Sequence, residues 1–568
     1  MGSQSEIKFF FIINLRMNPM KKTYTKIRHL VMKNPINPWS VLTFLFCFLL
    51  VGPFGALFVL AFGVDGELWS HLFETVFPRY VKNTLFLMAG VGILSLFFGI
   101  TTAWIVARLK FPGVKVLEWC LILPATIPAY IIAYTYTDFL EYAGPVQVLL
   151  REVFDWNSSR DYWFPEIRSM GGAIFVMATV LYPYIYLFAR TAFRMTPRTY
   201  YETALFYNRS FPILVDLPLA RPAIVAGLAL VLMEVISDFG TVEYFAIETL
   251  TLGIFNVWLG MNNLAGAAQI ALIAFFLIIC LLYVEKSARS KQRFHAPVKA
   301  GLDIAPKKIK LLSAVICSIF CLFPIICGFF LPVTILLDFV LNSQSLPSAI
   351  EVLDSAFNSL LISSSAAVGV VIVATITVFT ITYKNHPFLS AVSSIAATGY
   401  AFPGVVLAIG IISFSSFLEG GAAWASDQLL GFKTSTFLIG GVGLLIFGYI
   451  VRFQAIGFGA MNSGVKRVSP NIMNASFVLG LNFSGTMIRL GPPLFYKSML
   501  TAGLLVFVDV MKELPLTLIL RPFNFETLST SVYQLAKDEL LEQAAPESLM
   551  IVIAGLLPIW LINSTQRD

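Results

Sequence analysis

Two pairs of acidic residues lie inside long apolar segments of this sequence, at a spacing that allows joint chemistry. Glu234 and Asp238 are four residues apart in "LVLMEVISDFG", and Asp509 and Glu513 are four residues apart in "VFVDVMKELPL". On a helix this spacing places both carboxylates of a pair on one face. A charged side chain costs about 2.5–3.5 kcal/mol at a bilayer centre on insertion scales, so acids kept there usually mark an ion or substrate route. The pairs therefore predict a path that favours a cation and opposes anions.

A structural explanation of these acids stays open beside the functional one. Lys512 lies next to Glu513 and could neutralise a neighbouring acid, whereas the segment around Glu234 and Asp238 contains no base. Gly240 and Pro515 each follow two residues behind the second acid of a pair. Both residue types loosen or break a helix, and such interruptions occur in membranes where backbone lines a cavity. We therefore expect two helix breaks beside the path.

The elements that carry these acids are predicted to be membrane-spanning helices. The chain of 568 residues is 57% hydrophobic and 12% charged, with a mean hydropathy of +0.80, against about 25% charged residues in a typical soluble domain. Apolar runs of about 20 residues indicate an all-α polytopic membrane protein, because only helices pair their own backbone groups in lipid. The twelve predicted spans are 41–63, 83–107, 116–137, 171–193, 222–244, 265–284, 311–340, 358–383, 389–415, 434–455, 495–519 and 547–564.

Charge in the connecting loops predicts the orientation of the chain. The N-terminal segment and the stretch 285–310 are strongly basic, whereas the loops 64–80 and 138–170 are mixed or acidic. Basic residues collect in cytoplasmic loops, so both termini are expected in the cytoplasm. The net charge of +7 then needs no nucleic-acid partner. The four histidines are scattered and no cysteine pair has CxxC spacing, so no tight metal site or His-based catalytic centre is expected.

An internal repeat organises the chain. Five pairs of residues share one offset of 275: Asn83 and Asn358, Pro128 and Pro403, Pro218 and Pro493, Glu234 and Asp509, and Asp238 and Glu513. Five anchors at one offset indicate two repeats of six helices in like orientation. A pseudo-two-fold axis along the membrane normal is the natural arrangement for such repeats. It would place the two acidic pairs at matching positions along one path.

The predicted domains follow from this repeat. They are a cytoplasmic basic segment 1–40, a first six-helix repeat 41–284, a cytoplasmic linker 285–310 and a second six-helix repeat 311–568. Each repeat contains a loop too polar to span, at about 196–222 and at about 469–493. The first reads "TPRTYYETALFYNRSFPILVDLPLARPAI" and the second "SPNIMNASFVLGLNFSGTMIRLGPPL". Both end at a proline-containing helix start.

These two loops resemble those of the membrane subunits of bacterial ATP-binding-cassette (ABC) importers of type I. In that family the loop reads Glu-Ala-Ala, with Gly six residues after the Glu, and forms a coupling helix that docks on the ATPase. Here Glu202 and Ala204 fit in the first loop, which is shorter and lacks the Gly; in the second, Asn474 stands in place of Glu, followed by Ala475, with Gly480 in place. The resemblance implies these five residues as coupling residues.

Partners and substrate follow from the same resemblance. The chain contains no Gly-Lys dipeptide, so it has no Walker A loop for ATP phosphates, binds no cofactor of its own and needs a separate ATPase, expected as a dimer. "DVMKELPLTLILRPFNFETLSTSVYQLAKDELLEQAA" and "ISDFGTVEYF" are similar to fused ferric-iron permeases. That family implies a periplasmic solute-binding protein and residence in the bacterial inner membrane. The expected activity is import of ferric iron by alternating access.

The sequence leaves alternative substrates and alternative classes of protein to consider. Fused thiamine permeases share the architecture, so thiamine or another organic cation is the alternative substrate. An ion-coupled secondary transporter also has twelve spans, repeats and buried acids, but it needs neither the coupling loops nor an ATPase. A membrane enzyme would need a nucleophile, base or metal-ligand constellation at the bilayer edge, and the sequence offers none.

Overall fold

The computed structural model describes most of the chain between Pro38 and Thr565. The described residues are 38–63, 72, 74–196, 200–202, 213–290, 306–343, 346–384, 387–396, 398–430 and 439–565. Residues 1–37 of the predicted basic segment 1–40 and much of the first coupling loop therefore lie outside the described residues.

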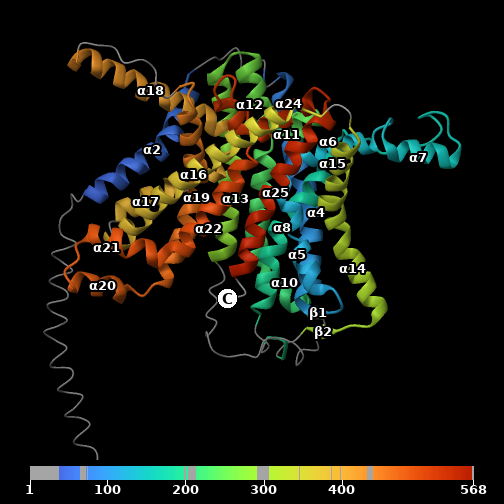
Figure 1. Ribbon diagram of the computed structural model, residues 1–568, viewed down its shortest axis with the longest axis horizontal. Helices are drawn as coiled ribbons and strands as arrows, with labels where there is room; N and C mark the ends of the chain where they lie inside the picture. Colours follow the sequence, from blue (N-terminus) through green and yellow to red (C-terminus); the bar gives the residue numbers. More distant parts are fainter. Residues whose placement is uncertain are drawn as a thin grey trace, which may run out of the picture. The chain divides into compact units, whose positions relative to one another are not determined.

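Long apolar helices dominate the described structure, as the composition predicts (Figure 1). Ten helical segments within the described ranges are long and apolar enough to cross a membrane. They are α2 (Pro38–Ala61), α4 (Phe77–Arg108), α8 (Met170–Arg194), α10 (Ile213–Ser237), α13 (Leu264–Ser290), α14 (Leu311–Ile325) continuing through the π-helical turn η3 (Ile326–Phe330) into α15 (Leu331–Asn342), α16 (Ala349–Lys384), α18 (Gly404–Leu430), α19 (Val442–Arg467) and α22 (Gly491–Met511). This confirms an all-α polytopic membrane protein.

Two further helical stretches contain the remaining predicted spans, while at most eleven helices or bent pairs in the described ranges are long and apolar enough to cross a membrane. The predicted span 116–137 falls in a stretch that is bent by 91° between residues 114–126 and 129–154. It covers α5 (Val114–Cys120), the 3-10 turn η1 (Leu123–Thr126) and most of α6 (Ala129–Leu140), and α7 (Pro145–Phe154) follows them. The twelfth predicted span falls in α25 (Leu541–Thr565), whose side chains are described as far as Leu557.

Proline breaks two spans that the sequence analysis treats as continuous. The predicted span 116–137 is interrupted before Pro128, and the predicted span 389–415 is divided into α17 (Pro387–Ala396), the 3-10 turn η4 (Gly399–Ala401) and α18. Proline lacks an N–H and disfavours helical backbone in the residue before it, so each helix restarts just after Pro128 or Pro403. The prediction that these two spans are continuous was wrong. Pro128 and Pro403 are one of the residue pairs that share the offset of 275.

Helices in the second half of the chain begin about 275 residues after their counterparts in the first half. The starts of α16, α19, α22 and α25 lie within three residues of the positions that the offset predicts from α4, α8, α10 and α13. The short elements repeat as well: α11 (Gly240–Tyr244) corresponds to α23 (Pro515–Leu520), and α12 (Leu250–Phe255), which is followed by the π-helical turn η2 (Asn256–Gly260), corresponds to α24 (Leu528–Lys537).

The repeat extends to individual hydrogen bonds. Asn83 Nδ2 donates to the carbonyl oxygen of Glu248 at 3.0 Å, and its counterpart Asn358 donates to that of Glu526 at 3.1 Å. Each asparagine thus ties the start of a long helix to the segment that precedes α12 or α24. The carbonyl partners are 278 residues apart, so the second half carries three extra residues after α23.

The residues group into two compact units by their contacts. Unit 1 contains residues 1–51, 367–399 and 453–506, and unit 2 contains residues 52–366, 400–452 and 507–568. Unit 1 includes α20 (Pro470–Val478) and α21 (Phe483–Arg489). Its apolar core is formed by Ala374, Val378, Phe379, Met461, Val465, Met473, Phe483, Met487 and Phe495.

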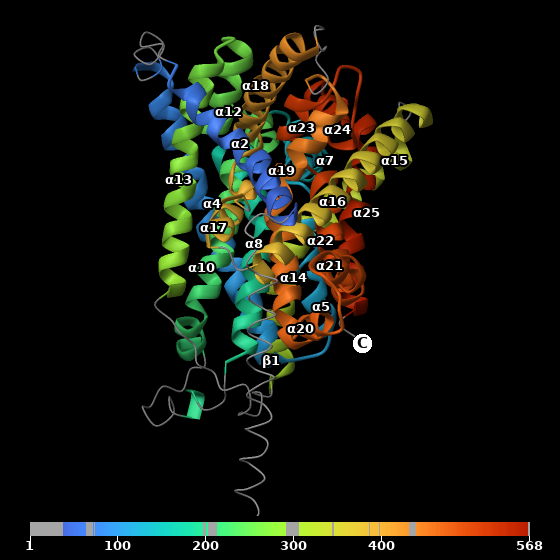
Figure 2. The ribbon, with the colours of Figure 1, turned by 90° about the vertical axis from the view of Figure 1, so that its left-hand side faces the viewer.

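Within unit 2, α4, α8 and α10 pack together closely (Figure 2). A Cβ atom at Gly99 of α4 would lie 2.7 Å from Cβ of Ile185, and one at Gly227 of α10 would lie 2.8 Å from Cα of Ile185. Both glycines are therefore needed for the approach of their helices to α8. Small residues at such contacts are typical of membrane helices.

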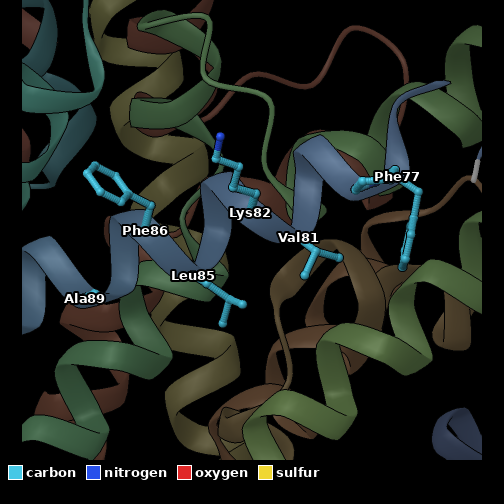
Figure 3. A pocket seen from close by; sticks show the side chains of 7 residues that line it. Phe77, Val81, Lys82, Leu85, Phe86 and Ala89 are labelled. Carbon is cyan, nitrogen blue, oxygen red and sulfur yellow. The ribbon is translucent and has the colours of Figure 1, made fainter. Parts of the chain in front are cut away.

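The opposite side of α4 carries large apolar side chains (Figure 3). Leu85 and Phe86 are 46% and 60% exposed, and they line a surface hollow of about 720 Å³ together with Val81 and Lys82. In a membrane this face meets lipid, and the aliphatic stem of Lys82 can lie along it while the ammonium group reaches toward water.

The predicted linker 285–310 is described only at its two ends. Helix α13 continues to Ser290, and residues 291–305 lie outside the described ranges. Just after them, β2 (Lys307–Lys308) pairs in parallel with β1 (Leu109–Lys110), with Leu109 opposite Lys307. The end of the linker is thereby held beside the end of α4.

Candidate translocation site and coupling loops

The first acidic pair lies at a helix break, as predicted from Gly240. Helix α10 ends at Ser237 and α11 begins at Gly240. In the gap, Asp238 Oδ1 accepts hydrogen bonds from the backbone N–H groups of Thr241 at 2.9 Å and Val242 at 3.3 Å, and Oδ2 accepts one from the Thr241 hydroxyl at 3.0 Å. Asp238 therefore caps the helix that follows the break.

The second break repeats this arrangement. Helix α22 ends at Met511 and α23 begins at Pro515. Glu513 Oε1 accepts from the N–H group of Leu516 at 3.2 Å, and Oε2 accepts from the N–H group and hydroxyl of Thr517 at 3.1 and 3.0 Å. Asp238 and Glu513 thus hold equivalent positions and equivalent backbone donors.

Glu513 also has a buried cationic partner, whereas no ion pair of Asp238 is found among the described residues. Arg452 Nε lies 3.6 Å from Glu513 Oε1, and both side chains are less than a tenth exposed. Gly404 makes room for this pair, because a Cβ atom there would lie 2.8 Å from Arg452 Nη1 and 2.9 Å from Glu513 Oε1. The equivalent of Arg452 in the first half is Met177.

The two breaks lie against each other within unit 2. A Cβ atom at Gly240 would lie 2.9 Å from Cδ2 of Leu514 and 2.8 Å from Cβ of Tyr130. Gly240 is therefore required for close approach as well as for the break. The predicted pseudo-symmetric meeting of the two acidic segments agrees with this contact.

Glu234 and Asp509, the first acids of each pair, belong to a second cluster. The Tyr400 hydroxyl donates to Glu234, and Lys512 Nζ lies 2.9 Å from Asp509 Oδ1. The Tyr184 hydroxyl lies close enough to Glu234, Asp509 and Lys512 to interact electrostatically with all three. The local partner Lys512, which the sequence analysis left open, is therefore a real neighbour of Asp509.

The structure brings all four predicted acids to the two breaks in unit 2. Four carboxylates face two cations, Lys512 and Arg452, so the formal charge around the breaks is negative. Sequence reasoning missed Arg452, Tyr184 and Tyr400, which come from other helices at distances in sequence that no local pattern connects. A role of the four acids in translocation stays a prediction.

The first predicted coupling loop is described only in part. Glu202 is exposed in the short described segment 200–202, and Ala204 lies outside the described residues. A buried network holds both ends of this loop: Arg108 donates to Asp216 through Nε at 2.9 Å and through Nη2 at 2.6 Å, and also to the carbonyl oxygen of Phe193.

The same network anchors Tyr201, the neighbour of Glu202. The Tyr201 hydroxyl donates to Asp216, and the Arg108 guanidinium lies 5.1 Å from the centre of the Tyr201 ring. Burial, followed by the hydrogen bond to Asp216 and its negative charge, raises the pKa of Tyr201. The tyrosine therefore stays protonated and fixes the loop to the ends of α4, α8 and α10.

The second predicted coupling loop forms two short helices, α20 and α21. Gly480 follows α20 with φ +91°, and the N–H groups of Gly480 and Leu481 donate to the carbonyl oxygens of Phe477 and Ser476. These two bonds define a Schellman helix end, which glycine favours because the left-handed backbone strains other residues. Gly480, the glycine expected from the resemblance to ABC importers, is therefore favoured by the backbone conformation at the end of α20.

Anchors hold this second loop while part of its surface stays exposed. Met473, Phe483 and Met487 belong to the core of unit 1, and Trp39 Nε1 donates to the Ser484 hydroxyl at 2.7 Å. Asn474 is half-buried and Ala475 exposed. Large apolar side chains are also exposed on these helices: Ile472 (44%), Val478 (66%), Leu479 (84%) and Ile488 (64%).

Comparison with known proteins supports the resemblance. The chain is 24% identical over 502 residues to the Fe(3+)-transport system permease protein FbpB 2 of Haemophilus influenzae, covering 87% of this chain and 91% of that protein. It is 28% identical over 133 residues to the ferric transport system permease protein FbpB of Actinobacillus pleuropneumoniae, covering 23% of this chain and 19% of that protein. No family model matches the chain.

A third relative is much shorter. The molybdenum transport system permease protein ModB of Escherichia coli K12 is 26% identical over 213 residues, which cover 35% of this chain and 89% of that protein. Together these similarities and the apolar helices support a multi-pass inner-membrane permease subunit of an ABC-type importer. The predicted resemblance to ferric-iron permeases is confirmed at the level of sequence similarity.

Proposed function

We propose that this chain moves ferric iron from the periplasm to the cytoplasm as the fused permease subunit of an ABC importer. The observation that carries the proposal is similarity along nearly the whole length of a protein named as an Fe(3+)-transport permease. In the proposed system, a separate ATPase dimer supplies the energy from ATP, and a periplasmic binding protein delivers the iron. Both termini of this chain lie in the cytoplasm in this proposal.

The charge at the helix breaks supports a cationic substrate. Glu234, Asp238, Asp509 and Glu513 outnumber Lys512 and Arg452 by two formal charges. A net negative site attracts cations and opposes an anion such as molybdate, although one shorter relative is named for molybdenum transport. The acids are held by protein partners, so they would bind a passing ion weakly and release it, as conduction requires.

The fused two-repeat organisation supports a complete pathway in one chain. ModB matches about a third of this chain with nearly its whole length, which is what fusion of two such permease units would give. In the proposed mechanism the two repeats rock against each other about a pseudo-two-fold axis. The broken helices α10–α11 and α22–α23 would then line the moving path.

The exposed surface of α20 and α21 supports coupling to an ATPase. Leu479 and Val478 are among the most exposed apolar side chains of these helices, and exposed apolar groups on a polar loop are typical of protein-interaction sites. We place one ATPase subunit on this loop and the other on the loop that begins near Glu202. ATP binding would draw the two loops together, and hydrolysis would release them.

Uptake of labelled substrate tests this function. Cells lacking their own iron permeases would express this chain together with the binding protein and the ATPase of the same transport system. They would receive labelled ferric iron, thiamine or molybdate in parallel. ATP-dependent accumulation of iron alone is expected. Thiamine uptake without iron would replace the substrate but keep the importer. Uptake that persists with a hydrolysis-dead ATPase would reject the importer in favour of an ion-coupled transporter.

A further inference from the structure

Helix α7 lies outside the packed membrane-spanning helices, and the proposed function gives it no role. It belongs to the segment 141–169, which joins α6 to α8. Because both neighbours belong to membrane-crossing stretches, this segment must lie at the membrane surface where α6 ends. Figure 1 shows α7 running crosswise to α4 and α8 and extending away from them.

One side of α7 is occupied by polar contacts within the segment. Gln147 is buried, and its Nε2 donates to the carbonyl oxygen of Leu140 at 2.8 Å. The Tyr162 hydroxyl donates to Gln147 Oε1 at 2.6 Å and accepts from Arg151 Nη1 at 3.0 Å. Gln147 and Arg151 are four residues apart, so these bonds fix which face of the helix turns toward the protein.

The opposite side of α7 is an apolar stripe. Val146, Leu149, Leu150 and Val153 follow the i, i+3, i+4, i+7 pattern of one helix face. Leu149 and Val153 are 60% and 66% exposed, and Phe154 at the end of the helix is 57% exposed. The polar bonds on one side and the stripe on the other make α7 amphipathic across its axis.

Aromatic side chains lie at the end of α7 and in the loop that follows it. Trp163 in the following loop is 86% exposed, and Phe154, Trp156 and Tyr162 form a stack with ring centroids 4.8 Å apart at each step. Tryptophan and tyrosine are enriched where a bilayer meets water. An amphipathic helix with such residues, lying crosswise at the end of spanning helices, has the form of an interfacial membrane anchor.

We propose that α7 binds the lipid surface, with Val146, Leu149, Leu150 and Val153 inserted at the boundary between headgroups and acyl chains. The stripe would continue the lipid-facing surface of the spans, which carry exposed apolar side chains such as Leu85 and Phe86. A docked binding protein is the less favoured occupant, since α7 extends away from α8, against which α10 with Glu234 is packed (Figure 1). The anchor would hold the bent α5–α6 stretch in place during transport.

Lipid-attached quenchers test this anchor in the full chain. A fluorescent probe would be attached at Val153→Cys, or at Glu152→Cys as the matched neighbour off the stripe, after the six native cysteines are replaced. The protein would be placed in nanodiscs of phosphatidylethanolamine and phosphatidylglycerol with brominated acyl chains. We expect at least roughly two-fold stronger quenching at position 153 than at position 152.

If the labelled variants fail to fold, hydrogen exchange on the unmodified chain tests whether α7 binds the lipid surface. The amides of residues 145–154 should exchange several-fold more slowly in lipid nanodiscs than in a lipid-free amphipathic polymer. Equal, weak quenching at both positions, or equal exchange in both media, would overturn the proposal. Shielding that appears only with added binding protein, or only at high concentration of this chain, would assign the stripe to a protein partner or a second copy instead.

Discussion

At the scale of single residues, the four membrane acids divide into two kinds. Asp238 and Glu513 accept backbone hydrogen bonds that begin α11 and α23, and Glu513 also faces Arg452. Glu234 and Asp509 have side-chain partners instead, namely Tyr400 and Lys512. The first kind builds the helix breaks, and the second kind is better placed to respond to a passing cation.

Replacing Glu513 by Gln should lower stability more than replacing Asp238 by Asn. The glutamine would remove the carboxylate charge that faces the buried Arg452, at a cost on the order of 3 kcal/mol, whereas asparagine can still cap α11 at a cost of about 1 kcal/mol or less. The measurement is the thermal unfolding midpoint of each purified variant. The double change Glu513→Gln with Arg452→Met should recover part of the loss; equal midpoints for both single variants would contradict the buried pair.

Glu234→Gln should reduce uptake of labelled iron without changing the unfolding midpoint. The substitution keeps the size of the side chain and its acceptor for Tyr400, but it removes one negative charge from the site. At an effective dielectric of about 20, a unit charge 4 Å away contributes about 4 kcal/mol, so a several-fold loss of uptake is a conservative expectation. Glu248→Gln, which affects only an exposed ion pair with Arg79, is the control. Unchanged uptake in the Glu234 variant would assign this acid a structural role.

At the scale of elements, glycine and proline residues determine where helices end and restart. Pro128, Pro403, Gly240 and Pro515 each stand at or beside the restart of a helix. Gly480 ends α20 with a left-handed backbone and open space around its Cα. At the breaks before Gly240 and Pro515, the side chains of Asp238 and Glu513 accept hydrogen bonds from the exposed backbone N–H groups.

Gly480→Ala should weaken coupling to the ATPase, because alanine strains the left-handed end of α20 by about 1–2 kcal/mol. The exposed Leu479 beside it would shift with that end. Gly459→Ala is the matched control: it also lies in open space, but within α19 and without a positive φ, so alanine there should be neutral or slightly stabilising. Transport-linked ATPase activity of reconstituted complexes measures both. The same activity in both variants would show that the end of α20 does not matter for coupling.

At the scale of the whole molecule, two related halves hold their coupling loops by different means. The first loop is tied by the buried Arg108–Asp216 pair, and the equivalent positions in the second half are Tyr383 and Gly491. The second loop is held by the apolar core around Met473 and Phe483. The repeat thus preserves the order of helices while the two loops differ in chemistry.

This difference predicts unequal coupling by the two loops. Glu202→Ala should impair transport-linked ATPase activity more than Asn474→Ala, since Glu202 is exposed and carries a full charge for a bond with the ATPase, whereas Asn474 is half-buried and neutral. Hydrogen bonds to charged groups contribute about 1.5–3 kcal/mol, so a loss of roughly ten-fold is expected for Glu202→Ala. Gly459→Ala, which lies in α19 outside both loops, is the control. Equal and negligible effects at Glu202 and Asn474 would refute the asymmetry.

The sequence by itself determined the membrane class, the 275-residue offset and the helix breaks beside Gly240 and Pro515. Composition and apolar runs decide these features because lipid admits few backbone solutions, and the equal spacing of Asn83 with Asn358 and of Asp238 with Glu513 is visible without coordinates. The continuous spans over 116–137 and 389–415 were wrong, since hydropathy does not register the break that Pro128 or Pro403 imposes.

Only the tertiary structure decided which partners the acids have and which face of each helix is covered. Arg452 meets Glu513 across 61 positions of sequence, and Tyr400 meets Glu234 across 166. Such contacts depend on how helices pack, and periodicity within one segment carries no information about a distant one. The same holds for α7, where the bonds of Gln147 and Tyr162 determine that the apolar stripe faces outward.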